Sequence, residues 1–227
     1  MGRPISLYYD LMSQPSRALW IILKMSKAPF EDYQVALRKG EHMSTEFKTI
    51  NRFQKVPCID DNGFKLAESI AILRYLSQKG IISSALYPTD IKEQARVDEF
   101  LEWQHLTLRL GCALFFREKV LEPSLSGQQP KAEKIKKLKQ TMEGNLDIFE
   151  KIWLEKGNYL SGDRLTAADI FAACEIEQTR GAGYDASDKY PKLKAWIGKV
   201  RKETGPHYEA AHKYLNKLVS AQAKAKL

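Results

Sequence analysis

The first candidate for chemistry is a pair of serines, Ser13 and Ser16, at the start of a predicted helix. A β-rich run at Ile5–Tyr9 precedes them, and apolar residues at helical spacing follow over residues 15–25. A redox CxxC motif would need cysteine at both serine positions, so disulfide exchange is excluded here. The Ser13 hydroxyl, facing a helix N-terminus, could bind a ligand or could simply cap the helix, and this segment alone favours neither reading.

Two further segments carry groups that could bind a ligand. Lys55 and Val56 precede Pro57 just before a predicted strand, and by frequency alone the Val56–Pro57 bond is expected to be trans. A bend at this point would leave the Val56 backbone unpaired by the sheet, so it could bind a peptide as an added strand. Glu68 and Ser69 open the next predicted helix, whose N-terminus could bind a carboxylate while Glu68 pairs with an amino group. Ordinary capping is the alternative.

Isolated polar residues give weaker signals. His42 lies in a polar loop, where a histidine is usually solvated, and Lys55 would not stand out by itself. Arg109 interrupts the apolar residues 106–116, so it could form a buried ion pair, extend to the surface, or bind an anion in a substrate pocket. Thr166 and Asp169 have the spacing of a capping box, which is a folding signal rather than a chemical one.

The elements that would position these groups form an α/β domain followed by an all-α domain. Strands and helices alternate in the order β-α-β-α-β-β-α, which is too small for a doubly wound sheet. The hairpin is marked by Asn62-Gly63. The predicted strands are residues 5–9, 30–37, 56–59 and 64–66, and the predicted helices are residues 15–25, 43–50 and 68–79.

Composition changes after this domain. We predict a first domain at residues 1–82, a linker at 83–89 and an all-helical domain at 90–227. Asp90 and Glu93 fit a capping box that opens a long helix carrying Asp98, Arg109 and Arg117. Apolar residues at spacings of three and four predict helices over residues 135–153 and 193–200, and the Ala-Lys tail at 221–227 is expected to fray.

Charge and cysteine content exclude several classes of function. The net charge of +8 is diffuse, and the lysines at 131–139 suit a solvated helix face, so no nucleic-acid partner is expected. Cys58, Cys112 and Cys174 are odd in number and far apart, which argues against disulfides and a metal site. No apolar run could span a bilayer and no secretory leader is evident, so we expect a cytoplasmic protein without membrane insertion.

Together these segments resemble the cytosolic glutathione transferases over nearly the whole chain. The resemblance is carried by residues 7–17, 55–57, 68–72 and 166–169, in matching order and spacing. Residues 13–15, 40–42, 95–99 and 103–105 resemble the theta class, and we expect its insect members to be most similar. The resemblance implies a thioredoxin-like N-terminal domain, a helical C-terminal domain and a homodimer.

The resemblance also implies an activity and a set of roles. It implies conjugation of the glutathione thiolate to small hydrophobic electrophiles, with peroxide reduction as a further activity, and glutathione as co-substrate with no other cofactor. It implies that Ser13 hydrogen-bonds the glutathione sulfur, that Pro57 is cis and that Arg109 lies near the electrophile. The implied glutathione site is His42, Lys55, Val56, Glu68 and Ser69. The alternative is a non-catalytic docking module of the same fold, which usually lacks the ligand residues.

Overall fold

The N-terminal part of the chain folds around a four-stranded sheet. The computed structural model describes residues 3–224. The strand order is β2-β1-β3-β4, with β2 parallel to β1 and the other pairs antiparallel. In chain order the elements are β1 (Ile5–Tyr9), α1 (Gln14–Met25), β2 (Phe30–Gln34), α2 (Thr45–Ile50), β3 (Cys58–Asp61), β4 (Phe64–Ala67) and α3 (Ser69–Gln78). This is the thioredoxin-like arrangement predicted from the sequence.

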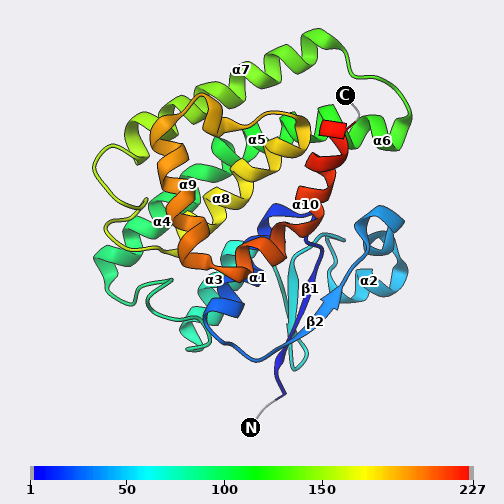
Figure 1. Ribbon diagram of the computed structural model, residues 1–227. Coiled ribbons are helices and arrows are strands. Elements are labelled where there is room, and N and C mark those ends of the chain that lie inside the picture. The colour runs from blue at the N-terminus through cyan, green and yellow to red at the C-terminus, as the bar shows by residue number, and fades with distance from the viewer. Residues whose placement is uncertain (1–2, 225–227) are drawn as a thin grey trace.

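The alternation of side chains along β1 explains how the sheet is covered on both faces. Ile5, Leu7 and Tyr9 are buried in the main core, to which α1 and α3 contribute. Tyr8 points to the other face, where it packs near Phe47 of α2. Figure 1 shows α1 and α3 between the sheet and the helical domain, with α2 on the opposite side.

The rest of the described chain is helical. Its helices are α4 (Ile91–Leu106), α5 (Leu108–Phe116), α6 (Glu122–Ser126), α7 (Ala132–Ile148), α8 (Ala167–Gln178), α9 (Pro191–Thr204) and α10 (Pro206–Lys224). Residues 79–90, between α3 and α4, contain no helix or strand. The division into 1–82, 83–89 and 90–227 stays a prediction. Among residues 3–224, no helix has the length and apolar character needed to cross a membrane.

Helix α8 forms the centre of the helical domain. Every residue from Ala167 to Gln178 is buried, because α8 packs against α1, α4, α5 and α9. Its small residues allow these close approaches. Four buried side chains of α8 are polar, namely Asp169, Glu175, Glu177 and Gln178. Each of them therefore needs a hydrogen-bond or ion-pair partner inside the protein.

The structure corrects one predicted helix. Asp98, Arg109 and Arg117 do not share a continuous α-helix, because the backbone breaks at Thr107 between α4 and α5. The Thr107 hydroxyl donates to the carbonyl of Trp103, four residues back, which competes with regular helical bonding. Arg117 itself begins a π-helical segment, Arg117–Leu121.

Several predicted boundaries are also wrong. β2 ends at Gln34 rather than at residue 37, and β3 begins at Cys58 because the chain turns at Pro57. The helix predicted over 135–153 becomes α7, which passes into a π-helical segment at Phe149–Trp153. The tail expected to fray is helical through Lys224, and residues 225–227 lie outside the described part.

Candidate active site

Ser13 lies between β1 and α1, and its hydroxyl does not cap the helix. It is the N-cap residue of α1 by backbone geometry, but its side chain makes no capping hydrogen bond. The Ser13 Oγ instead lies 3.5 Å from the carbonyl oxygen of Val56, a long and therefore weak contact. The side chain is partly exposed. A ligand atom could therefore take this hydroxyl as a donor at little cost.

Asp10 and Arg17 hold the loop before Ser13. Asp10 accepts hydrogen bonds from the backbone N–H groups of Met12 at 2.7 Å and Leu37 at 3.1 Å. Arg17 is fully buried and donates to the carbonyl oxygens of Leu11 at 2.8 Å and Met12 at 3.4 Å. The loop that carries Ser13 is therefore fixed from both sides by charged side chains.

Arg17 also joins the two domains. Its Nη2 donates to the carbonyl of Cys174 at 3.0 Å and to the side-chain oxygen of Gln178 at 2.6 Å, both on α8. Our sequence analysis assigned no role to Arg17. The available signal was a charged residue within the apolar face of a helix, between Ser16 and Ala18, which are also buried.

Sheet register brings the segments of Val56 and Glu68 to the same edge of the sheet as Ser13. Tyr8 pairs with Cys58, and Cys58 pairs with Ala67, so the chain segments beside these residues lie in one row. Val56 and Pro57 precede Cys58 and are joined by a cis peptide bond, as the resemblance implies, rather than by the trans bond favoured by frequency. Glu68 follows Ala67 directly.

Glu68 has an unusual backbone conformation. Its φ of 67° and ψ of 110° are costly for a residue with a side chain. It is exposed at the N-cap of α3, next to Ser69, which is buried at the first turn. Such outliers concentrate at ligand sites, which is consistent with the role predicted for this pair.

His42 lies in a short 3-10 helix, Glu41–Met43, and Lys55 lies in the loop before Pro57. Gln54 donates from its side chain to the His42 carbonyl at 3.4 Å, and Asn51 donates to the Lys55 carbonyl at 2.6 Å. The Nδ1 atom of His42 is buried without a hydrogen-bond partner in the structure. Lys55 is exposed and forms no ion pair within residues 3–224. Both side chains therefore have donor or acceptor capacity left for a ligand.

Arg109 occupies a different environment. Its Nε lies 3.4 Å from Glu175 Oε1, and its Nη1 lies 3.3 Å from His105 Nδ1. Burial raises the pKa of Glu175 to about 7, against the opposing effects of Arg109 and Arg17. Of the three readings of Arg109, the geometry supports an ion pair with a buried partner. Its role near an electrophile stays a prediction.

Thr166 and Asp169 form the predicted capping box at the start of α8. The Asp169 carboxylate accepts from the Thr166 backbone N–H at 2.9 Å. It also accepts from the Leu160 backbone and the Trp196 indole, each at 2.9 Å. Burial raises the pKa of Asp169 despite these hydrogen bonds. The pair is structural, since it joins α8 to α9 and to the preceding loop.

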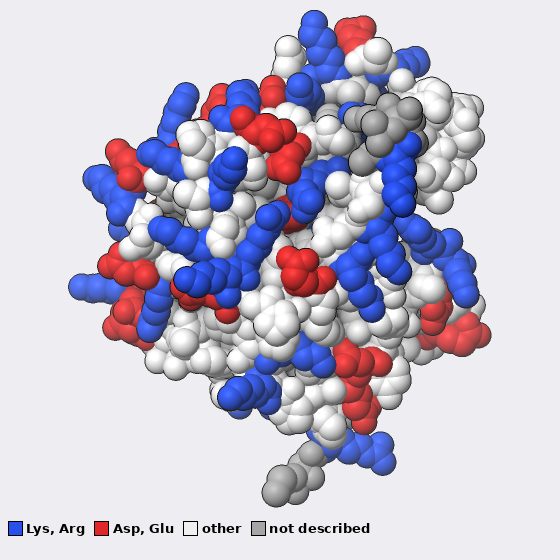
Figure 2. Space-filling view, viewed as in Figure 1, with Lys and Arg blue, Asp and Glu red and all other residues white. Residues whose placement is uncertain are grey.

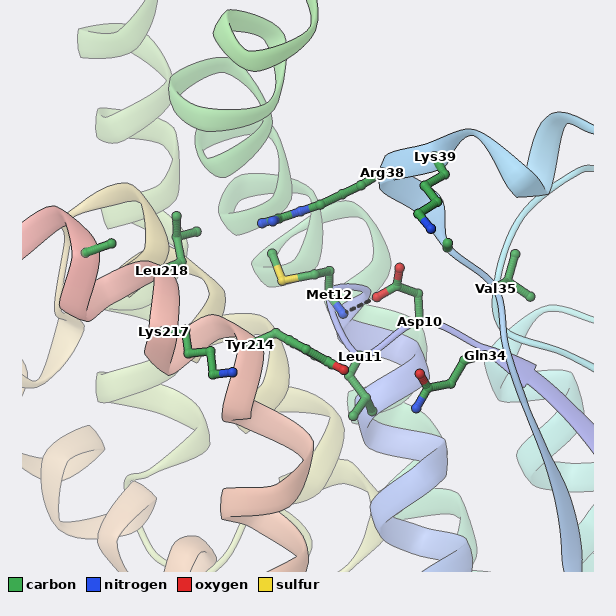
Figure 3. Close-up of a pocket in the computed structure, with 12 residues that line it drawn as sticks. Asp10, Leu11, Met12, Gln34, Val35, Arg38, Lys39, Tyr214, Lys217 and Leu218 are labelled. Atoms are coloured by element: carbon green, nitrogen blue, oxygen red, sulfur yellow. Dashed lines mark hydrogen bonds between the residues drawn. The ribbon is translucent and has the colours of Figure 1, made fainter.

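A pocket of about 640 Å³ opens beside the loop that carries Ser13. One side is formed by residues 10–12, 34–36, 38 and 39, and the other by α10. Figure 3 shows Arg38 extending across it toward Met12, with Tyr214 and Lys217 on the α10 side. Ser13 itself does not line the pocket, but its neighbour Met12 does.

Comparison with known proteins places this geometry in a family. The family model for the glutathione S-transferase N-terminal domain matches residues 5–78, and the model for the C-terminal domain matches residues 107–203. Rat glutathione S-transferase theta-1 is 38% identical over 201 residues, covering 88% of this chain and 84% of the relative. Apo human glutathione S-transferase T1-1 superposes with a TM-score of 0.90 at 35% identity, covering 95% of this chain and 91% of that one. This chain belongs to the theta-class glutathione transferases.

Another human theta-class glutathione transferase extends the comparison. Its structure, in complex with the glutathione conjugate of 1-menaphthyl sulfate, has a TM-score of 0.91 and 36% identity over 99% of this chain and 92% of that one. A delta-class glutathione transferase structure from Nilaparvata lugens is 28% identical, with a TM-score of 0.81. The match covers 96% of this chain and 99% of that one. The expected closeness of insect theta-class members stays a prediction. Family membership favours a transferase over the docking-module alternative.

The chemistry of this theta-class chain does not draw on its cysteines. Cys58, Cys112 and Cys174 are buried and unpaired, and burial raises the pKa of the Cys58 and Cys174 thiols to about 12. Within residues 3–224, no group of His, Cys, Asp and Glu has a metal-binding arrangement.

Proposed function

We propose that this transferase binds glutathione along the row that joins Ser13, Val56 and Glu68, and adds its thiolate to small hydrophobic electrophiles. The observation that carries the proposal is the Ser13 hydroxyl, which stands at a helix start without serving as its cap. In the proposed complex, the Val56 backbone pairs with the peptide, and Glu68 and Ser69 hold its amino and carboxylate groups. His42 and Lys55 face its other carboxylate, while Pro57 shapes the turn.

The proposed chemistry is stabilisation of a thiolate. A free thiol has a pKa of about 8.5, so only a small fraction is ionised near neutral pH. A hydroxyl that donates to sulfur favours the charged form, as does the N-terminus of α1. Lowering the pKa by about two units requires about 2.7 kcal/mol of preferential stabilisation. Ser13 then acts as a donor and not as a base, and the thiolate attacks an electrophilic carbon or a peroxide oxygen.

We also propose an assembly and a location. A homodimer accounts for the large apolar side chains exposed on the N-terminal domain, since Met43, Phe53 and Phe64 are 63%, 53% and 50% exposed. A cytoplasmic location agrees with the free cysteines. Arg109 would lie on the electrophile side of the site, held by Glu175.

The test compares Ser13→Ala with a matched control, Ser16→Ala. The Ser16 hydroxyl is buried and has no hydrogen-bond partner within residues 3–224, so its removal should change little. We expect Ser13→Ala to retain glutathione binding while the pKa of the bound thiol returns toward the free value. Turnover should fall about 100-fold, the usual cost of removing one donor to a developing anion. Thiolate absorbance titrations and initial rates measure both effects, and unchanged turnover in Ser13→Ala would contradict the proposal.

A further inference from the structure

The pocket beside the Ser13 loop combines apolar walls with positive charge. Leu11 and Met12 line it from the N-terminal domain, and Tyr214 and Leu218 line it from α10. Figure 3 shows these side chains facing the same space, with the Tyr214 ring extending toward Leu11. A volume of about 640 Å³ lies in the range of small-molecule sites.

Three cations line the same pocket, namely Arg38, Lys39 and Lys217. None of them forms an ion pair within residues 3–224. The one acidic residue of the lining is Asp10, whose two carboxylate oxygens already accept backbone N–H groups. Figure 2 shows blue side chains gathered where α10 meets the N-terminal domain. Three cations and one carboxylate give the lining a net charge of +2, so the pocket presents a positive field.

We propose that this pocket selects electrophiles that have an apolar body and an anionic group, such as an aromatic carboxylate or sulfonate. The apolar body lies between Met12 and Leu218, and the anionic group is held by Arg38 and Lys217. This inference rests on the proposed function, whose electrophile class it narrows. It concerns a different surface from the glutathione row, because Ser13, Val56 and Glu68 do not line the pocket.

The location suits the reaction because Met12 is bonded to Ser13. An electrophile anchored by its anionic group would have its reactive carbon near the sulfur held at Ser13. The thiolate electron pair then forms the carbon–sulfur bond, and the leaving group departs with the electrons of its own bond. The anionic group takes no part in this exchange, so its contribution is to binding and orientation.

The experiment uses two acceptors that differ by one carboxylate, chlorodinitrobenzene and chlorodinitrobenzoate. The variants are Arg38→Gln, Lys217→Gln and their combination, with Lys136→Gln on α7 as the control. Lys136 is exposed, lines no part of this pocket, and its replacement changes the net charge equally. For the double variant we expect kcat/KM for the anionic acceptor to fall about tenfold, as befits two partly exposed charge contacts. The neutral acceptor should change less than about twofold, and added salt should weaken only the anionic reaction.

Direct binding separates this inference from the proposed function. Anilinonaphthalene sulfonate is the anionic probe and phenylnaphthylamine its neutral counterpart, both read by fluorescence. If the sulfonate still needs Arg38 and Lys217 while neither these acceptors nor an organic hydroperoxide reacts with glutathione, the proposed function fails and the anion pocket stands. If both acceptors are conjugated and the substitutions change kcat/KM equally for the two, the pocket inference is overturned. A rise in the KM for glutathione that is equal for both acceptors would also overturn it, since the cations would then serve glutathione.

Discussion

Replacing Glu175 with glutamine should make the protein less sensitive to pH. Glu175 is only 1% exposed, and its Oε1 lies 3.4 Å from the Nε of Arg109. Its Oε2 has no hydrogen-bond partner in the described part of the chain. Since Arg109 is 31% exposed, water screens part of its charge. Burial therefore dominates and raises the pKa of Glu175 from 4.5 to about 7.

The sign of the effect follows from proton binding. Between the unfolded pKa and the folded pKa of Glu175, the folded protein holds more protons than the unfolded chain, so its stability falls as pH rises. The stabilisation that comes from protonated Glu175 is lost as the pH rises through its folded pKa of about 7. A shift of this size corresponds to about 3 kcal/mol in full, and to roughly 2–3 kcal/mol between about pH 5 and about pH 8.

Urea unfolding of the wild type and Glu175→Gln at equal protein concentration provides the assay. Glutamine cannot ionise, so the variant should lack this pH-dependent loss. The free energy of unfolding of the wild type, relative to the variant, should fall by roughly 2–3 kcal/mol over that pH range. Parallel curves would refute the reasoning, because they would mean that Glu175 keeps an ordinary pKa and that its pair with Arg109 offsets burial.

Three other substitutions test the remaining contacts. Arg17→Met removes a buried cation and leaves the Leu11 carbonyl without its donor, so the free energy of unfolding in urea should fall by about 3 kcal/mol or more. A fall of less than about 1 kcal/mol would contradict the role of Arg17 in holding the Ser13 loop. Asp169→Ala should cost about 3–5 kcal/mol in the same assay, because three buried N–H donors lose their acceptor, and a neutral effect would count against the capping box. Asp10→Asn retains one acceptor for two N–H donors, so it should cost about 1 kcal/mol and lower kcat/KM by steady-state assay; unchanged kinetics would argue that this loop is held by other contacts.

Much of the fold could be predicted because it depends on local patterns. Alternation in β1 and the helical spacing of α1 each reflect which face of one element is buried, and Asn62 and Gly63 supply the positive φ angles of the turn between β3 and β4. The break at Thr107 could not be predicted in this way. Helical spacing continues across it, and the local cause is a side-chain hydroxyl that bonds the preceding turn. A distant residue also takes part, since Asn145 donates to the Thr107 carbonyl at 2.8 Å.

The candidate site likewise contains residues that local motifs predict and residues that depend on distant partners. Ser13, Val56 and Glu68 could be named from short motifs, and the register of the sheet places their segments in one row. The residues that hold the site in shape depend on partners far along the chain. Arg17 bonds α8 across 157 and 161 positions, and such pairings leave no spacing in the sequence.

These long-range contacts give α8 a role in the site that burial alone does not explain. A helix surrounded on all sides would be more stable with apolar residues, since buried ionised groups are expensive to desolvate. Yet α8 carries Glu175 toward Arg109 and Gln178 toward Arg17. Glu177 likewise pairs with Arg180 at 2.6 Å and with Arg201 of α9. The acids and the amide of α8 therefore fix arginines that lie on other elements. One of these arginines holds the loop of Ser13, so changes inside α8 should alter catalysis through the position of that loop even where no side chain of α8 reaches the substrate.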